Sequence, residues 1–124
     1  MGANKYRNRK ITRNGITYDS QKEARRHAEL LLLEKTGTIS GLQRQVKFVL
    51  IPAQYEPNTI GKRGGVKRGK LIERAVTYIA DFVYTQGGDT IVEDVKSEIT
   101  RKEPLFVVKR KLMLWVHGIR IKET

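Results

Sequence analysis

The chain has 124 residues and a hydrophobic content of 39%, which suits a single domain with one modest core and argues against disorder. It has no apolar run long enough to cross a membrane and no secretory signal pattern. The absence of cysteine excludes disulfides and thiolate zinc sites and is compatible with the cytoplasm. The net charge of +12 predicts a polyanionic partner, either nucleic acid or an acidic protein or membrane surface.

Residues 1–18 carry five lysines and arginines and no acidic residue. This composition predicts a flexible basic arm that leads into the turn signal Asn14-Gly15. Such an arm either contacts phosphates without sequence preference or is a solvated tail.

A helix is predicted over residues 21–35, with Ser20 as its N-cap and Gly37 at its end. Glu23 completes a capping box with Ser20 and would reach back to the Ser20 backbone. The run 30–33 consists of four leucines and is too apolar for one narrow stripe. We expect the sheet to cover one side of it, and a homodimer partner is one candidate for the other side.

Residues 45–51 alternate in the manner of a strand that ends at Pro52. Gln45 is either an ordinary polar residue at the start of this strand or a hydrogen-bond partner of a phosphate or of a metal-bound water. Glycine and cations fill residues 56–70, which predicts a mobile basic loop. The loop is either an insertion without function or a segment that wraps a duplex backbone through Lys62, Arg63, Lys67, Arg68 and Lys70.

Residues 71–85 and 90–96 predict a β-hairpin, because β-branched and aromatic residues flank Gly87-Gly88. Centring the turn on this glycine pair places Asp81 opposite Asp94, and Lys96 projects from the same face as Asp94. Facing carboxylates repel each other and are costly among apolar residues, so a cation should lie between them.

A divalent metal is the cation that best explains this arrangement. Magnesium takes hard oxygen ligands and needs only one or two protein carboxylates beside water and phosphate, with manganese as a substitute. Asp81 and Asp94 suit that role, a backbone carbonyl near Val95 could add a ligand, and Lys96 would touch the attacking water and the scissile phosphate. The alternative is an ion triad that is neutralised internally, although such triads add little net stability.

A second helix is predicted to begin at Glu103-Pro104 and to stop at His117-Gly118, with Lys109 and Arg110 on its basic face. Residues 119–121 are predicted to form a short last strand. The resulting order is α-β-β-β-α-β, an α/β fold with a mixed sheet flanked by helices.

The chain has the element order α-β-β-β-α-β, Asp81 thirteen residues before Asp94-Val95-Lys96, and a helix glutamate at Glu23. In these features it resembles the PD-(D/E)XK nuclease superfamily. Within the superfamily, its helix glutamate, Asp-Phe step and short acid-x-Lys strand look similar to small phage-encoded endonucleases, including the junction-resolving endonuclease I type. Its strings Ala-Asp-Phe-Val-Tyr, Val-Glu-Asp-Val-Lys and Lys-Arg-Lys-Leu-Met also look similar to a phage and prophage family assigned to this superfamily. The resemblance spans about residues 20–121 and implies a restriction-endonuclease-like αβββαβ core.

The resemblance also implies roles for individual residues. Asp81 and Asp94 would bind the metal, Lys96 would be the catalytic lysine, and Glu23 would be a direct or outer metal ligand. Gln45 is implied as a polar residue near the site. Ala80 stands where the motif has proline, and Glu93 should point to the opposite face from Asp94.

Three functions follow as expectations. The first is a metal-dependent DNA endonuclease that acts on branched or otherwise structured DNA, with basic segments that grip backbones rather than read bases. The second is a non-catalytic DNA-binding or packaging accessory protein on the same fold. The third is an RNA-directed nuclease, since phosphate contacts do not distinguish the sugar.

Overall fold

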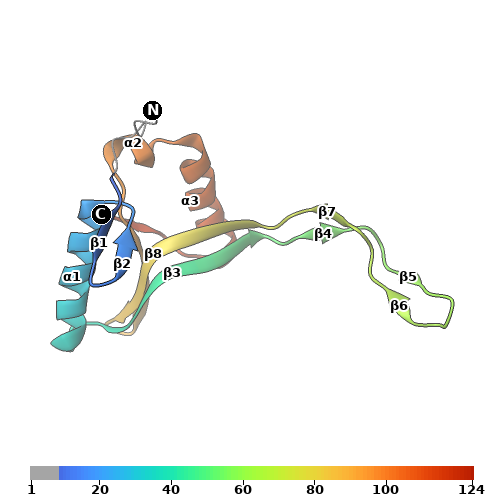
Figure 1. The fold of residues 1–124 in the computed structure, drawn as a ribbon, viewed down its shortest axis with the longest axis horizontal. Coiled ribbons are helices and arrows are strands. Elements are labelled where there is room, and N and C mark those ends of the chain that lie inside the picture. Colours follow the sequence, from blue (N-terminus) through green and yellow to red (C-terminus); the bar gives the residue numbers. More distant parts are fainter. Residues whose placement is uncertain (1–8) are drawn as a thin grey trace.

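The computed structural model describes residues 9–124 and has a mixed four-stranded sheet at its centre (Figure 1). The strand order is β10-β9-β8-β3, where β3 spans Ser40–Ile51, β8 spans Val76–Gln86, β9 spans Asp89–Asp94 and β10 spans Lys122–Glu123. The pairs β3–β8 and β8–β9 are antiparallel, whereas β10 pairs with β9 in parallel. The predicted α/β class with a mixed sheet and flanking helices is confirmed.

The β8–β9 hairpin has the predicted register. Gly87 and Gly88 form the turn with φ angles of 59° and 84°, a combination that glycine adopts without steric cost and that matches the twist of the strands. The pairing runs from Gln86 opposite Asp89 to Phe82 opposite Glu93. Asp81 and Asp94 are the next two residues along these strands.

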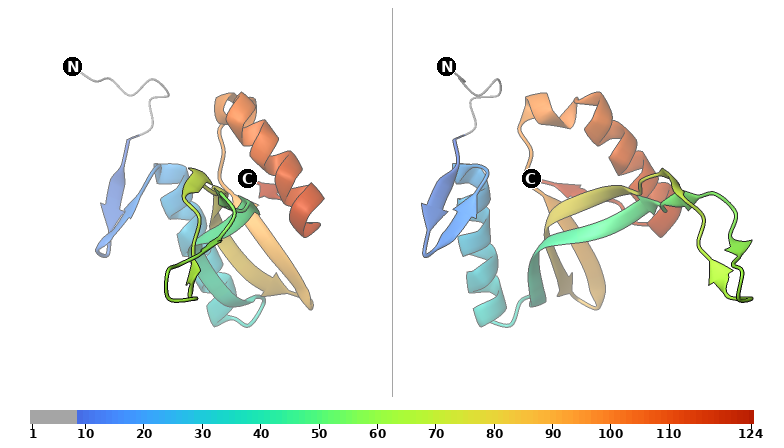
Figure 2. Two further views of the ribbon diagram at one scale, coloured as in Figure 1. Left: turned by 90° about the vertical axis from the view of Figure 1, so that its right-hand side faces the viewer. Right: turned by 45° about the vertical axis from the view of Figure 1, so that its right-hand side comes forward.

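Two long helices flank the sheet, as the turned views show (Figure 2). Helix α1 spans Gln21–Lys35 and packs Leu30 against Phe82 and Tyr84 of β8. Helix α3 spans Pro104–His117 and packs Phe106 and Met113 into a second cluster. The other buried members of that second cluster come from the strands and from the C-terminal segment: Leu50, Tyr78, Ala80, Val92 and Ile121.

The segment predicted as a basic loop contains two short strand pairs. Strand β4 (Gln54–Tyr55) pairs with β7 (Leu71–Glu73), and β5 (Thr59–Ile60) pairs with β6 (Val66–Lys67). Together they continue β3 and β8 into a long projection (Figure 1), which we call the arm and define as residues 54–73. The periodicity of two such short pairs is too weak to detect among glycines and lysines.

Three further differences from the sequence predictions are local. Strands β1 (Ile11–Arg13) and β2 (Ile16–Tyr18) form a hairpin around Asn14-Gly15 beside α1, so this half of the predicted flexible arm is structured. Residues 1–8 lie outside the described part of the chain. A one-turn helix α2 (Glu98–Arg101) precedes α3, and the last strand pairs at 122–123 rather than at 119–121.

Candidate functional site

The carboxyl groups of Asp81 and Asp94 lie close together where β8 and β9 leave their regular pairing. Asp94 is 1% exposed, and the Val95 amide donates a hydrogen bond of 2.9 Å to Oδ2 of Asp81. Burial, followed by the proximity of Asp94, raises the pKa of Asp81 to about 8, although the Val95 amide and Lys96 act in the opposite direction. In such a pair one carboxyl group ionises readily, but both are ionised together only when a cation lies nearby.

Lys96 supplies part of that positive charge. Its ammonium Nζ lies 3.3 Å from Oδ2 of Asp94 and 4.9 Å from the centre of the Phe106 ring. Within residues 9–124, Oδ2 of Asp94 and the hydroxyl of Tyr78 are buried and have no hydrogen-bond partner of good geometry. Burial and then the charge of Asp94 raise the pKa of Tyr78, which keeps its hydroxyl protonated. Oδ2 of Asp94 is therefore held by the charge of Lys96 and the neighbouring Tyr78 hydroxyl rather than by a well-aligned hydrogen bond, and a bound cation would share it with them.

Glu23 is 3% exposed and is held by several donors at the start of α1. Its Oε1 accepts hydrogen bonds from Gln45 (3.2 Å) and Arg44 (3.4 Å), and its Oε2 accepts one from the Asp19 amide (3.3 Å). The Ser20 hydroxyl caps the Glu23 amide as predicted, but the Glu23 carboxylate reaches the Asp19 backbone instead of Ser20. Burial and then the charge of Asp81 raise the pKa of Glu23.

Gln45 links Glu23 to the acidic pair. Its amide Nε2 also lies 3.5 Å from Oδ1 of Asp81, so one side chain bridges both carboxylates. Gln45 has a φ of 53°, a left-handed conformation that non-glycine residues rarely adopt within a strand. A strained residue is common where the backbone must aim a functional side chain.

The donor set suits a magnesium ion that keeps most of its water. Among the described residues no cluster of three or more His, Cys, Asp or Glu side chains is arranged around a common point. Asp81 and Asp94 therefore form a two-carboxylate set, with Glu23 connected to them through Gln45. Magnesium commonly binds through one or two carboxylates, so the residues present fit this ion. The proposed Val95 carbonyl ligand stays a prediction.

Lys96 stands between two cavities. One has a volume of about 190 Å³ and lies between the first turns of α1 and α2, where Glu23 and Lys96 line it. The other has a volume of about 290 Å³ and lies between β8 and α3, lined by Lys96, Tyr78 and Lys109 among others. A phosphate could approach Lys96 from either side.

Glu93 has a different role, as the sequence predicted. It is fully buried, accepts two hydrogen bonds from Arg26, and accepts one of 2.7 Å from the Tyr84 hydroxyl. Burial raises its pKa, but the Arg26 and Tyr84 hydrogen bonds outweigh this and hold the pKa below its ordinary value. Glu93 thus has no capacity left for a metal.

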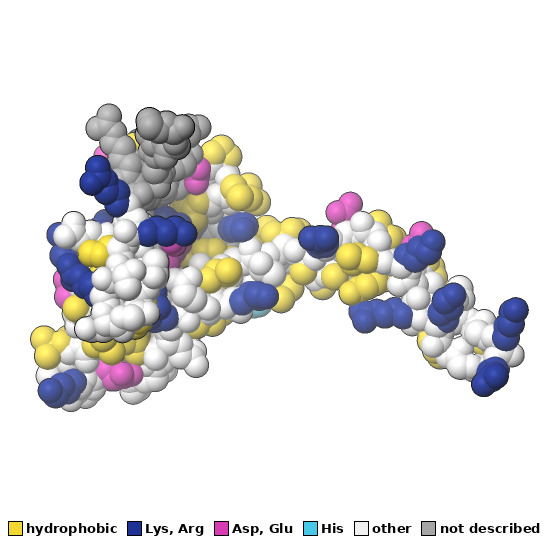
Figure 3. Space-filling model, in the orientation of Figure 1, with side chains coloured by type: hydrophobic (Ala, Val, Ile, Leu, Met, Phe, Trp, Pro, Cys, Tyr) yellow, Lys and Arg dark blue, Asp and Glu magenta, His cyan; other side chains and the backbone are white. Residues whose placement is uncertain are grey.

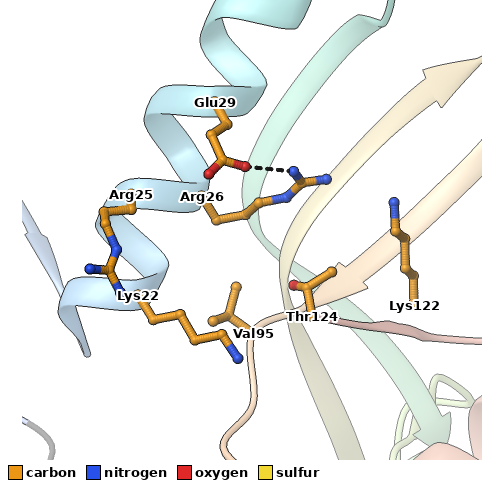
Figure 4. Close-up of a pocket in the computed structure, with 7 residues that line it drawn as sticks. All are labelled: Lys22, Arg25, Arg26, Glu29, Val95, Lys122 and Thr124. Atoms are coloured by element: carbon orange, nitrogen blue, oxygen red, sulfur yellow. Dashed lines mark hydrogen bonds and ion pairs between the residues drawn. The ribbon is translucent and has the colours of Figure 1, made fainter.

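A basic cavity of about 390 Å³ lies above this ion pair, between α1 and the C-terminal strand (Figure 4). Arg26 turns toward Glu29 across its upper part, and Lys22 extends along its lower edge to the Lys96 carbonyl oxygen, 3.1 Å away. This cavity shares Lys22 and Val95 with the cavity beside Glu23. Lys22 and Arg26 carry no functional signal in the sequence, because their spacing on α1 resembles an ordinary solvated helix face.

The predicted nucleic-acid contacts separate into two groups. Lys109 borders the same cavity as Lys96, whereas Arg110 lines another cavity with Lys111 and Arg120. The other predicted cations lie on the arm, where blue side chains continue to its tip (Figure 3): Lys62, Arg63, Lys67, Arg68 and Lys70.

The fold and site define an α/β protein with an acidic pair, an adjacent lysine and a strongly basic surface. The chain belongs to the family described as "Protein of unknown function (DUF1064)", which matches residues 3–117. No curated protein and no solved structure matches the chain. No helix in the described residues is long and apolar enough to span a membrane.

Proposed function

We propose that the chain is a metal-dependent DNA endonuclease of the PD-(D/E)XK type that cleaves phosphodiester bonds in branched or otherwise structured DNA, in the cytoplasm. The observation that carries the proposal is the close Asp81–Asp94 pair, with the Lys96 ammonium 3.3 Å from Oδ2 of the buried Asp94 carboxylate. The net charge of +12 supplies the attraction for a polyanion.

Each residue has a role that follows from its contacts. Asp81 and Asp94 would hold Mg²⁺, which would supply a charge that polarises a phosphate oxygen and lowers the pKa of water. Lys96, whose side chain is 27% exposed and forms an ion pair with Asp94, binds the scissile phosphate and stabilises the charge that develops on its oxygens. Gln45 and Glu23 orient Asp81, because the Gln45 amide fixes one of its carboxylate oxygens.

The second candidate is a DNA-binding or packaging accessory protein without turnover. It is favoured by the saturation of Glu23 by Arg44, Gln45 and the Asp19 amide, which leaves two carboxylates for the metal. An RNA substrate is the third candidate, which the choice of nucleic acid in the assay addresses.

The deciding experiment incubates the protein with branched, single-stranded and linear duplex DNA, and with matched RNA, in magnesium, manganese or chelator. We expect metal-dependent cleavage of branched DNA that Asp94→Ala abolishes while binding persists. Lys96→Ala should lower turnover about 10²- to 10³-fold, as loss of a transition-state charge partner does, with a much smaller change in DNA affinity.

Lys102→Ala is the matched control, because this lysine caps α2 and lies outside the cavity linings described above. Tight binding without cleavage in any metal would select the accessory protein. Equal losses of affinity and turnover in Lys96→Ala would reduce Lys96 to a phosphate anchor.

A further inference from the structure

The arm, residues 54–73, projects away from the sheet, and most of its residues are exposed. Ile60 and Val66 are 79% and 76% exposed, and they face each other in the β5–β6 pair near the tip. Two large apolar side chains at the end of a projection gain nothing from the core of their own chain. Their placement indicates a surface that a partner covers.

The arm nevertheless has a defined shape. The Glu56 amide donates to the Lys70 carbonyl (2.8 Å), and the Gly69 amide donates to the Asn58 side chain (3.1 Å). The guanidinium of Arg68 lies 4.1 Å from the centre of the Tyr55 ring. A side chain at Gly69 would meet the Glu56 carbonyl oxygen at 1.9 Å, so the two strands approach each other more closely than alanine allows. A segment preorganised in this way loses little conformational freedom on binding.

The chemistry of the arm fits a polyanion better than a second copy of the chain. It carries five cationic side chains and two acidic ones, so two arms brought together would repel each other. The phosphates of a duplex flank a groove whose floor offers base edges and apolar atoms, including the thymine methyl group. Cations along a ribbon with an apolar pair at its tip match that arrangement.

We propose that the arm inserts as a two-stranded β-ribbon into the major groove of a DNA duplex that extends from the site of cleavage. The major groove of B-DNA is about 12 Å wide and admits a two-stranded ribbon, whereas the minor groove is about 6 Å wide and takes one only where the duplex is deformed. In the groove the arm's cations bind phosphates, and Ile60 and Val66 contact base edges. The inference deepens the proposed function, and it rests on DNA being the substrate.

The length of the arm sets the size of the contact. The nine residues from Gln54 to Lys62 in the turn extend at most about 30 Å. At about 3.4 Å per base pair, this corresponds to roughly nine base pairs beyond the DNA bound by the sheet and helices. Because the major groove of duplex RNA is deep and narrow, the arm also favours DNA over RNA duplexes.

The test is a footprint of the full chain on a DNA duplex in chelator, so that cleavage plays no part. Hydroxyl radicals report the protected sugars, and dimethyl sulfate reports guanine N7 in the major groove and adenine N3 in the minor groove. We expect protection over up to about nine base pairs on one side, with guanine N7 protected there and adenine N3 reactive.

Two glycine variants separate the shape of the arm from its charge. Gly69→Ala forces the strands apart at Glu56, whereas Gly65→Ala meets no atom within 4 Å and has φ outside the left-handed region. We expect Gly69→Ala to lose the extended footprint and to weaken binding at least tenfold, while Gly65→Ala stays within twofold of the parent. Melting curves check that the core is folded in both variants.

A charge variant measures the phosphate contacts directly. Replacing Lys62, Arg63 and Lys67 by glutamine should reduce the slope of log affinity against log salt by about 2.7, because each phosphate contact contributes about 0.9. Substituting the exposed pair as Ile60→Ser with Val66→Ser should remove the guanine protection and leave the salt slope unchanged.

The outcomes distinguish this inference from the proposed function. Absence of DNA binding by the parent chain overturns both. DNA binding with the same footprint in the parent and Gly69→Ala overturns the arm insertion alone. Protection of sugars without protection of guanine N7 would place the arm outside the major groove and overturn the proposal. Self-association in the absence of DNA that Gly69→Ala abolishes would identify a second copy of the chain as the partner of the arm, and would overturn it as well.

Discussion

Replacing Asp81 by asparagine tests whether the acidic pair repels itself in the absence of metal. The side chain keeps its size and loses its charge, so the variant carries one carboxylate where the parent has two. The pKa of Asp81 rises from its ordinary 3.8 to about 8, because burial and the nearby Asp94 disfavour the ionised form. The folded protein therefore holds a proton that the unfolded chain releases at much lower pH.

The sign and size of the effect follow from this difference. A group with a raised folded-state pKa stabilises the fold fully below its unfolded value, and this contribution is lost as pH rises from about 4 to about 8. About four units at about 1.4 kcal/mol each give an upper limit of roughly 6 kcal/mol. Asparagine avoids that loss, but it weakens one hydrogen bond, to Val95 or to Gln45, at a cost of about 1 kcal/mol.

The measurement is urea unfolding in chelator at pH 4.5 and pH 8.5. We expect Asp81→Asn to be slightly less stable than the parent at pH 4.5 and more stable by a few kcal/mol at pH 8.5. The control Asp89→Asn, at the exposed start of β9, should follow the parent at both values. Magnesium should raise the melting temperature of the parent at pH 8.5 and leave that of Asp81→Asn nearly unchanged. An asparagine variant that is no more stable than the parent at pH 8.5 would show that the two carboxylates do not repel each other in the folded protein.

Two other predictions concern the frame of the site. Arg26→Met leaves the fully buried Glu93 without its paired guanidinium. The free energy of unfolding, measured in urea at pH 7, should fall by about 3–5 kcal/mol. A loss below about 1 kcal/mol would mean that Lys122 takes the place of Arg26 beside Glu93. Gly118→Ala places a side chain at φ 67° in the C-cap of α3, where the added Cβ meets nothing within 4 Å and only the backbone conformation is strained. The stability measured by thermal melting should fall by about 1 kcal/mol. An unchanged melting temperature would show that α3 ends independently of this residue.

The parts of the fold that the sequence predicted are those with a local determinant. Gly87-Gly88 specify a two-residue turn, and this turn sets the register that brings Asp81 beside Asp94 and sends Glu93 to the other face. Pro104 and Gly118 mark the ends of α3 in the same way. Such signals act over a few residues and need no tertiary information.

The parts that escaped prediction depend on distant contacts. Arg26 and Glu93 are 67 residues apart, and the tertiary packing that lays α1 against the sheet brings them together. The role of Tyr78 follows from its burial near Asp94, whereas in sequence it is one of several strand aromatics. Residues 119–121 are apolar enough for a strand, yet Ile121 packs into the core and pairing begins only at Lys122.

The pairing of β10 with β9 makes the acidic residues depend on the last few residues of the chain. The Thr124 amide donates to the Asp94 carbonyl, and the Thr124 carbonyl accepts from the Lys96 amide, both at 3.0 Å. Loss of the backbone pairing of residues 122–124 would release both ends of this short ladder, and β9 would become an open edge. The backbone positions of Asp94 and Lys96 thus depend on a strand that contributes neither carboxylate of the acidic pair.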